Sequence, residues 1–407
     1  MVNDVLVLDP RIQVGLTLAP CLIGKIALAI YLDHQASTPI LPTVRDAMQP
    51  FWAELHGNPH SSEHSTGWSA NKATESSRAK VANLIGADSD EIIFTSGATE
   101  ANNLAIKGLG FPEQQQSQRK TILVAATEHK CVLESAAYVA QAKGCSLYKI
   151  PVDGKGHVDL DKLQDMLTED VLMVSVALVN NEIGTVQNIA AISKLCRDAG
   201  AIFHSDFAQA PSAVNLLDYA DLADMVSLSG HKFGGPMGIG ALYVSRELKG
   251  RIEPLFHGGG QEWGMRSGTL ALPLCVGIGA AAEFYTSEAG PASRQRVANL
   301  RDLFVNKLQS GRDLIRLNGD MLSSRHPGNA NLRFEGHEAN EILQRLQPIV
   351  SASTGSACSS GITEPSYVLS AIGLTLDEAQ ASIRFSFGHT NTADEVLEAA
   401  EAVTAVL

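Results

Sequence analysis

Short apolar segments alternate with helical segments along most of the chain after residue 66. We predict strands at the apolar runs, which are 91–95, 120–125, 146–150, 171–179, 201–205 and 224–228. Apolar positions at helical spacing predict helices between them, at 70–85, 102–108, 133–142 and 189–199. This alternation is typical of an α/β protein with a mostly parallel sheet covered by helices.

The pattern changes after residue 245. A glycine-rich loop over 257–269 is followed by a long apolar helix at 270–285. We interpret 288–293 as a linker and 297–308 as a second helix. A smaller α+β region then runs to residue 407, so the 407 residues are long enough for two domains.

Residues 1–30 do not fit the globular pattern. The apolar part of this stretch is interrupted by Pro20 and Lys25 and is too short to span a bilayer. It also lacks the basic start and the small-residue cleavage site of a signal peptide. We interpret it as an N-terminal extension of unknown role, and an upstream start codon chosen in error is the alternative.

The composition excludes several functions. The chain has 31 Lys and Arg against 44 Asp and Glu, a net charge of -13, which argues against direct nucleic-acid binding and against binding to an anionic membrane. The six cysteines contain no CxxC pair, so they indicate neither a disulfide framework nor a zinc site. His56, His60 and His64 are four apart, but Gly57–Pro59 breaks the helix that would align them, and we expect no metal. A reducing cytoplasm is the simplest location.

Polar side chains gather where the predicted strands end, which is where open α/β sheets bind ligands. Lys232 follows the run 224–228 and stands among glycines, where an amine can form a Schiff base with a carbonyl cofactor. A solvated lysine in a surface turn is the alternative. Asp206 closes another strand, and a buried aspartate there can hold a protonated pyridine nitrogen. It can equally be a helix cap.

Three further motifs lie at the same edge. The small residues at 96–99 precede a helix, and the free N–H groups of a helix start suit a phosphate, although a simple helix cap would look alike. His129 follows the strand at 120–125, where a lone histidine is often structural. Asn181 follows the run 171–179.

Two motifs in the last third of the chain carry reactive groups. Cys358 lies in the small-residue run 351–361, where a thiol is accessible. Arg384 lies inside the apolar run 382–386, which suits bidentate capture of a carboxylate, or a structural ion pair.

Taken together, these motifs resemble the pyridoxal-phosphate-dependent cysteine desulfurases of the NifS/IscS type, in the class V aminotransferase family. The resemblance runs from about Tyr31 to the C-terminus. It is carried by residues 96–100 (Ser-Gly-Ala-Thr-Glu), 127–130 (Thr-Glu-His-Lys), 180–184 (Asn-Asn-Glu-Ile-Gly), 204–209 (His-Ser-Asp-Phe-Ala-Gln), 229–232 (Ser-Gly-His-Lys), 265–269 (Met-Arg-Ser-Gly-Thr), 355–358 (Gly-Ser-Ala-Cys) and 382–386 (Ser-Ile-Arg-Phe-Ser).

The resemblance implies the aspartate-aminotransferase-like fold (fold type I). It implies a large cofactor-binding domain over 46–287 with a mostly parallel seven-stranded sheet. It also implies a smaller α+β domain over 288–407 that carries the catalytic cysteine loop, and a segment 31–45 that packs with the small domain. The implied enzyme is a homodimer that converts L-cysteine to L-alanine and passes the sulfur, as an enzyme persulfide, to an acceptor protein.

The resemblance also implies roles for single residues. Lys232 resembles the Schiff-base lysine, His129 the residue stacked on the pyridine ring, and Cys358 the persulfide-forming cysteine. The other cofactor-binding positions implied are Ala98, Thr99, Asn181, Asp206, Gln209, Ser229, His231 and, across a dimer interface, Thr269. Asn181 and Arg384 match positions that bind the substrate carboxylate.

One departure from the family stands close to these motifs: Trp263 occupies a position where the family commonly has arginine. The alternatives are a selenocysteine lyase or an aminotransferase of the same fold, or a non-catalytic scaffold. A P-loop or Rossmann nucleotide enzyme is disfavoured because neither GxxxxGK[ST] nor GxGxxG follows a strand. Iron–sulfur assembly, tRNA thiolation and DNA sulfur modification are all possible destinations of the sulfur.

Overall fold

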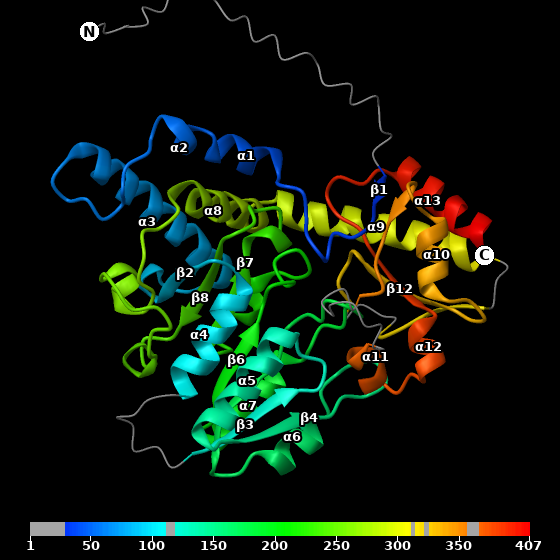
Figure 1. The fold of residues 1–407 in the computed structure, drawn as a ribbon, viewed down its shortest axis with the longest axis horizontal. Helices are drawn as coiled ribbons and strands as arrows, with labels where there is room; N and C mark the ends of the chain where they lie inside the picture. Colours follow the sequence, from blue (N-terminus) through cyan, green and yellow to red (C-terminus); the bar gives the residue numbers. More distant parts are fainter. Residues whose placement is uncertain (1–28, 111–118, 311–313, 321–324, 356–365) are drawn as a thin grey trace, which may run out of the picture.

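A seven-stranded sheet forms the centre of the larger part of the molecule (Figure 1). The computed structural model describes residues 29–110, 119–310, 314–320, 325–355 and 366–407. The strands lie in the order β2 (Ile92–Thr95), β8 (Gly240–Val244), β7 (Met225–Ser229), β6 (Ile202–Asp206), β5 (Val171–Ser175), β3 (Thr121–Ala125) and β4 (Ser146–Ile150). All neighbours are parallel except β8, which is antiparallel to both β2 and β7. The predicted fold class is confirmed.

Helices enclose this sheet, which explains why its strands are continuously apolar. Every residue of β2, β3, β5, β6, β7 and β8 is buried, as expected where both faces of a parallel sheet are covered. The edge strand β4 is mostly exposed. The helices of this part are α1 (Pro42–Met48), α2 (Pro50–Ala53), α3 (Ser65–Ile85), α4 (Ala98–Gly110), α5 (Lys130–Lys143), α6 (Leu160–Met166), α7 (Ile189–Ala199) and α8 (Leu272–Thr286).

A second, smaller sheet lies in the C-terminal part. Its antiparallel strands are ordered β12 (Ser382–Ser386), β10 (Asn329–Phe334) and β9 (Ile315–Leu317). The long helix α9 (Ala289–Gln309) and the last helix α13 (Ala393–Val406) pack together beside this sheet and share a separate hydrophobic core with it (Figure 1). The remaining elements are β1 (Ile30–Tyr31), α10 (Ala339–Arg345), β11 (Val350–Ser351), α11 (Tyr367–Ala371) and α12 (Leu376–Gln380).

The segment before α1 connects the two cores. β1 pairs in parallel with β11, and Leu32 is buried in the core of the smaller part. A few residues later, Leu41 and Val44 are buried in the core of the larger part. The segment 30–44 therefore touches both parts of the molecule. The domain boundaries at 45 and 287 stay a prediction.

Two expectations about single elements were wrong, and one strand was missed. The segment 288–293 is not a linker, because α9 is already helical from Ala289 and the chain breaks only around Ser287. β5 ends at Ser175, four residues before the predicted end. β8 was not predicted at all. It is a short apolar run directly after a glycine-rich turn, and its antiparallel pairing depends on partners distant in sequence.

The predicted N-terminal extension lies almost entirely outside the described residues. Within the described part of the chain, no helix combines the length and the apolar character that a membrane crossing requires.

Candidate active site

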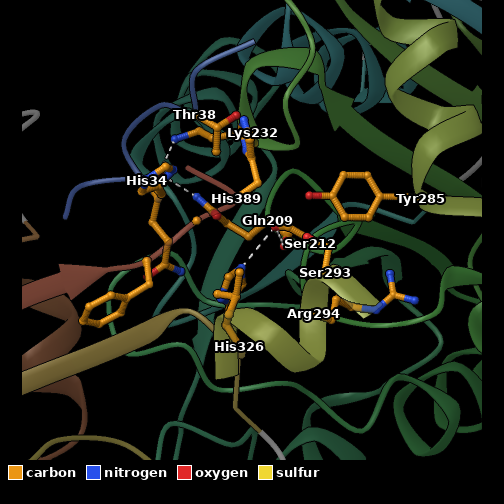
Figure 2. A pocket seen from close by; sticks show the side chains of 14 residues that line it. His34, Thr38, Gln209, Ser212, Lys232, Tyr285, Ser293, Arg294, His326 and His389 are labelled. Atoms are coloured by element: carbon orange, nitrogen blue, oxygen red, sulfur yellow. Dashed lines mark hydrogen bonds between the residues drawn. The ribbon is translucent and has the colours of Figure 1, made fainter. Parts of the chain in front are cut away.

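The lysine predicted to be reactive lies directly after β7. A short 3-10 turn, η3 (Gly230–Lys232), carries it. Its ammonium donates hydrogen bonds to the backbone carbonyls of Gln35 (2.7 Å) and Ala36 (2.9 Å). Figure 2 shows Lys232 beside a small cavity that Gln209, Tyr285 and other residues also line. The cavity measures about 20 Å³, which is room for one water-sized molecule.

Asp206 is the last residue of β6, one strand away from Lys232. Its carboxylate is 7% exposed and accepts hydrogen bonds from the Asn102 amide (2.7 Å) and the Ala208 N–H (2.8 Å). Both donors are neutral, so this buried carboxylate retains the capacity to hold a cationic group. Gln209 is also buried and donates to the Gln35 carbonyl (2.9 Å), the same oxygen that receives Lys232.

His129 lies at the start of α5, after β3. Its Nδ1 accepts the Cys131 N–H (3.2 Å) and lies 3.0 Å from the Cys131 sulfur. Burial lowers the pKa of His129, an effect that nearby Asp206 opposes and Lys232 reinforces. The ring is therefore neutral at pH 7, with its proton on Nε2, since Nδ1 is an acceptor.

The predicted phosphate cradle lies between two strand ends. Ala98 and Thr99 open α4, a helix of 13 residues, after Gly97 at φ 151°. Gly240 of β8 packs directly against this turn, because an added Cβ would lie 2.6 Å from the Gly97 Cα. Ser229, buried at the end of β7, faces the same turn, with its hydroxyl 3.8 Å from the Cβ position of Gly97. Unpaired N–H groups of a helix start beside a hydroxyl suit an anion.

His231 lies next to this group of residues. Its Nδ1 is 3.2 Å from the Ser37 hydroxyl, and its carbonyl accepts the Thr38 hydroxyl (2.9 Å). Burial, followed by the charge of Lys232, lowers the pKa of His231 to about 4. The imidazole is thus a neutral hydrogen-bonding group.

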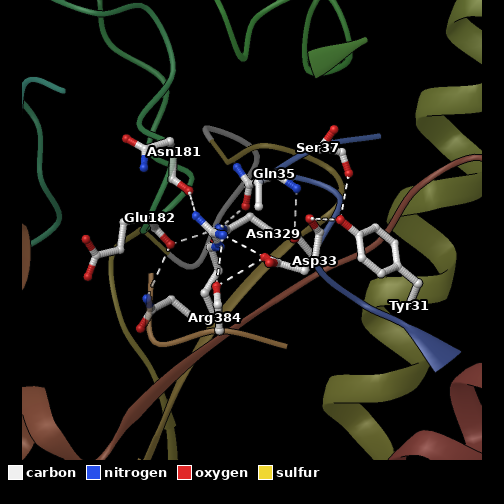
Figure 3. A network of polar contacts seen from close by, with 12 residues as sticks. Tyr31, Asp33, Gln35, Ser37, Asn181, Glu182, Asn329 and Arg384 are labelled. Carbon is white, nitrogen blue, oxygen red and sulfur yellow. Dashed lines mark hydrogen bonds and ion pairs between the residues drawn. The ribbon is translucent and has the colours of Figure 1, made fainter. Parts of the chain in front are cut away.

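Arg384 projects from β12 toward the larger part and is 3% exposed. Its Nη2 forms an ion pair with Asp33 (2.7 Å) and donates to the Ser353 hydroxyl (2.9 Å), while Nη1 donates to the Asn181 carbonyl (2.9 Å). Figure 3 shows this network. The structure therefore brings Asn181 and Arg384 together, through the backbone of Asn181.

Glu182 is a second buried carboxylate near this network. It is 2% exposed and packs against Gly355, where an added Cβ would lie 2.6 Å from the Glu182 Cγ. Burial raises the pKa of Glu182 to about 7, against the opposing effects of Ser366 and Arg384.

The remaining two predicted site residues are Thr269 and Cys358. Thr269 is exposed at the end of the loop that follows η5 (Gln261–Gly264). Cys358 lies outside the described residues. The competing thiol, Cys131, is half-buried, and burial raises its pKa to about 12, so it stays protonated at pH 7.

Comparisons with known proteins identify the family of the chain. Residues 30–398 match the family model described as aminotransferase class-V. A curated "Cysteine desulfurase IscS" of Rickettsia massiliae (strain Mtu5) is 45% identical over 374 residues, which are 92% of this chain and 90% of that one. A solved "NIFS-LIKE PROTEIN" has a TM-score of 0.84 at 31% identity, with 93% of this chain and 99% of that one covered. The structure "SspA in complex with cysteine" has a TM-score of 0.76 at 33% identity, with 88% and 98% covered.

The chain belongs to the aminotransferase class-V family, whose members depend on pyridoxal phosphate. Within that family it is a cysteine desulfurase.

The residues present fit this cofactor. The buried Asp206 carboxylate suits the protonated ring nitrogen, and the open turn at Gly97 with the α4 start suits the phosphate. β7 lies between β6, which ends in Asp206, and β8, which packs against the Gly97 turn. Lys232 directly follows β7 and so lies between the two groups.

Sequence reasoning missed the polar residues that hold the predicted ones in place. Gln35 accepts from both Lys232 and Gln209, Asp33 pairs with Arg384, and Asn102 holds Asp206. For Asp33 and Gln35, the signal in the sequence was the polar character of the turn at 33–38. That character does not indicate a role until the residues that the turn contacts are known.

We expect Glu182 to make stability depend on pH. Its carboxyl binds a proton more tightly in the folded chain than in the unfolded chain, where its pKa is near 4.5. The folded state therefore holds more protons between pH 4.5 and 7, and the free energy of unfolding falls as pH rises through this window, by roughly 3 kcal/mol. Glu182→Gln removes this loss. Denaturant unfolding at pH 5 and pH 8 should show the variant gaining stability over the parent at the higher pH. The exposed Glu169→Gln is the matched control, and an advantage of Glu182→Gln that is the same at both pH values contradicts the assignment.

Proposed function

We propose that the protein removes the sulfur of L-cysteine, leaves L-alanine, and holds the sulfur as a persulfide on Cys358 until an acceptor protein takes it. The observation that carries this proposal is that one turn, at 33–36, contacts both Lys232, which follows β7, and Arg384, which lies on β12. Lys232 can hold a carbonyl cofactor that in turn binds an amine, and Arg384 can bind a carboxylate. Two such groups at the two sides of one site favour an amino acid as the substrate.

When bound, pyridoxal phosphate supplies an electron sink for the bonds at the substrate α-carbon. Asp206 would hold the ring nitrogen, Gln209 the ring hydroxyl oxygen, and His129 would stack on the ring. Ala98, Thr99, Ser229 and His231 would hold the phosphate.

The residues of the chain divide the remaining work. Arg384 holds the substrate carboxylate. The Lys232 amine, once free, moves protons at the substrate carbon. The Cys358 thiolate attacks the substrate sulfur, so that an S–S bond forms while the C–S bond breaks. The carbon keeps the bonding electron pair and takes a proton, which gives alanine.

Two alternatives share the fold. A selenocysteine lyase would act on selenium in place of sulfur, and an aminotransferase would release a keto acid. The similar protein SspA has been solved in complex with cysteine, and this similarity favours cysteine as the substrate here. We propose that the protein that accepts the sulfur is a scaffold or a sulfur carrier. We also propose that the reaction takes place in the cytoplasm.

Lys232 should be the residue that holds the cofactor covalently. Lys232→Ala should lose the visible band of lysine-bound cofactor and at least about a hundredfold of turnover, because it removes both the attachment and the proton carrier. Borohydride reduction of the parent followed by peptide mass spectrometry should place the label on Lys232. Lys130→Ala, adjacent to His129, is the control, and a label on any other lysine contradicts the assignment.

Cys358 should be the thiol that accepts sulfur. Cys358→Ser should bind pyridoxal phosphate and cysteine normally but produce alanine only at background level, since a hydroxyl is a poor nucleophile toward sulfur. Cys131→Ser should stay largely active, because burial already keeps the Cys131 thiol protonated. Full alanine production by Cys358→Ser, or a persulfide found on Cys131, moves the role elsewhere.

We also propose a homodimer in which Thr269 completes the phosphate site of the partner. The exposure of Thr269 in the single chain supports this arrangement. Mixing Lys232→Ala with Thr269→Asp should restore activity, because one site of the hybrid then has an intact lysine and an intact partner threonine. If Thr269 acted within its own chain, no site of the hybrid would be complete and the mixture would stay inactive. Light scattering that finds an active, cofactor-loaded monomer also overturns the proposal.

A further inference from the structure

Two buried N–H donors in and around the turn at 33–36 lack an acceptor among the described residues. They are the side-chain amide nitrogen of Gln35 and the Nε of Arg384. The two residues are only 2% and 3% exposed, so water does not readily replace the missing partner. A buried donor without an acceptor is destabilising and needs an explanation, and a ligand that brings the acceptor is one.

The orientation of the Gln35 amide follows from its neighbours. The Arg325 guanidinium can only donate, and it donates to Asn329 Oδ1 (2.7 Å). Asn329 Nδ2 must therefore be the donor toward Gln35, and it lies 2.5 Å from Gln35 Oε1. The amide oxygen of Gln35 is thus committed as an acceptor. Its NH2 group is left facing the other way with two hydrogens to donate.

The Arg384 guanidinium is constrained in a similar way. Nη2 is occupied by Asp33 and Ser353, and Nη1 donates to the Asn181 carbonyl. These contacts fix the plane of the guanidinium and leave Nε with a hydrogen to donate. The Asp33 partner is two residues from Gln35 in the same turn.

Gln35 lies between the two ends of the proposed substrate site. Its backbone carbonyl receives the Lys232 ammonium, while its side chain belongs to the network around Arg384 (Figure 3). A substrate that reaches from the lysine side to the arginine side passes this residue. The group that it would present near Arg384 is its α-carboxylate.

We infer that Gln35 is a substrate-binding residue whose amide NH2 donates a hydrogen bond to the α-carboxylate of the amino acid, next to Arg384. An ionised carboxylate accepts hydrogen bonds and never donates, so it is a suitable partner for the Gln35 NH2 group and the Arg384 Nε–H, which both donate. The inference rests on the proposed function, because it takes Arg384 as the carboxylate-binding residue.

The sharpest variant is Gln35→Glu. It keeps an oxygen for Asn329 and the size of the side chain, but replaces the NH2 donor with a second acceptor. The ligand to use is L-alanine, which has the carboxylate but no sulfur to transfer, titrated calorimetrically into the cofactor-loaded protein. L-Alaninamide, which lacks the carboxylate, is the matched ligand. We expect the Kd for L-alanine to rise about tenfold or more, since a hydrogen bond to a charged group is lost. The Kd for L-alaninamide should stay within about twofold, because no such bond is lost there.

Controls separate this role from a structural one. Gln164→Glu makes the same change on the exposed surface of α6 and should leave both ligands unaffected. Cofactor absorbance and near-UV circular dichroism should match the parent. In turnover of L-cysteine, KM should rise more than kcat falls. If Gln35→Glu does not fold, Gln35→Ala removes the same donor without adding charge and should show the same ligand contrast.

The outcomes distinguish the inference from the function on which it rests. Weaker binding of L-alanine in Arg384→Gln but not in Gln35→Glu overturns the inference and leaves the proposed function intact. Equal weakening of both ligands in Gln35→Glu also overturns it, because the carboxylate is then not the group concerned. If Arg384→Gln binds L-alanine as well as the parent does, the carboxylate role of Arg384 in the proposed function fails.

Discussion

The turn at 33–36 is the constraint on which the site depends, because it fastens residues of two separate cores to one short backbone segment. Asp33 pairs with Arg384, which projects from the sheet of the smaller part. Gln35 and Ala36 hold Lys232, which follows a strand of the larger part, through their carbonyls. An ion pair this buried stabilises little overall, since desolvation offsets most of the attraction. It does fix where the guanidinium lies, and that position matters for binding a planar carboxylate.

The chain brings most of its reactive side chains to the site by a simple rule. Asp206, Ser229 and Thr95 are the last residues of buried strands, and His129 follows another. Strand ends are predictable from sequence because a buried parallel strand is a continuous apolar run, and polar residues mark its end. The α/β class, most of the strands, and the position of Lys232 and Asp206 at strand ends could therefore be predicted from the sequence alone.

What could not be predicted is set by contacts between distant residues. Gln35 takes its meaning from Arg325 through Asn329, and these residues lie some three hundred positions further along the chain. Gly240 of β8 packs closely on Gly97, a residue that is distant from it in the sequence. The segment 288–293 looks like a linker because it is rich in small residues and contains Gly290 and Pro291, yet the helix α9 begins at Ala289. Here Gly290 is needed because an added Cβ would lie 2.4 Å from the Tyr285 carbonyl. Local propensity carries no information about such neighbours.

The loop before Thr269 contains two consecutive non-glycine residues with a left-handed backbone. Glu262 and Trp263 have φ values of 50° and 54°, a left-handed conformation that costs a non-glycine residue roughly 1–2 kcal/mol. The Glu262 carboxylate offsets this cost. It is 4% exposed and accepts from both terminal nitrogens of Arg78 (2.7 and 2.8 Å) and from the Phe94 N–H (2.6 Å). The strained turn is thereby fixed to β2, directly before the phosphate cradle.

The contacts of Glu262 with Arg78 also place cations beside Trp263, the residue that the sequence comparison expected to be an arginine. The Trp263 ring has two cations over it, the Arg78 guanidinium at 4.9 Å and the Lys249 ammonium at 5.2 Å. An arginine at this position would add a third positive charge beside them, whereas the ring face attracts both. Further along the loop, Arg266 pairs with Glu100 in the first turn of α4 (2.8 Å). The loop is therefore held to the cradle of its own chain at two points while Thr269 stays exposed. A rigid loop of this kind loses little conformational entropy when a second chain receives it, which is the condition for contributing a residue to a partner's site.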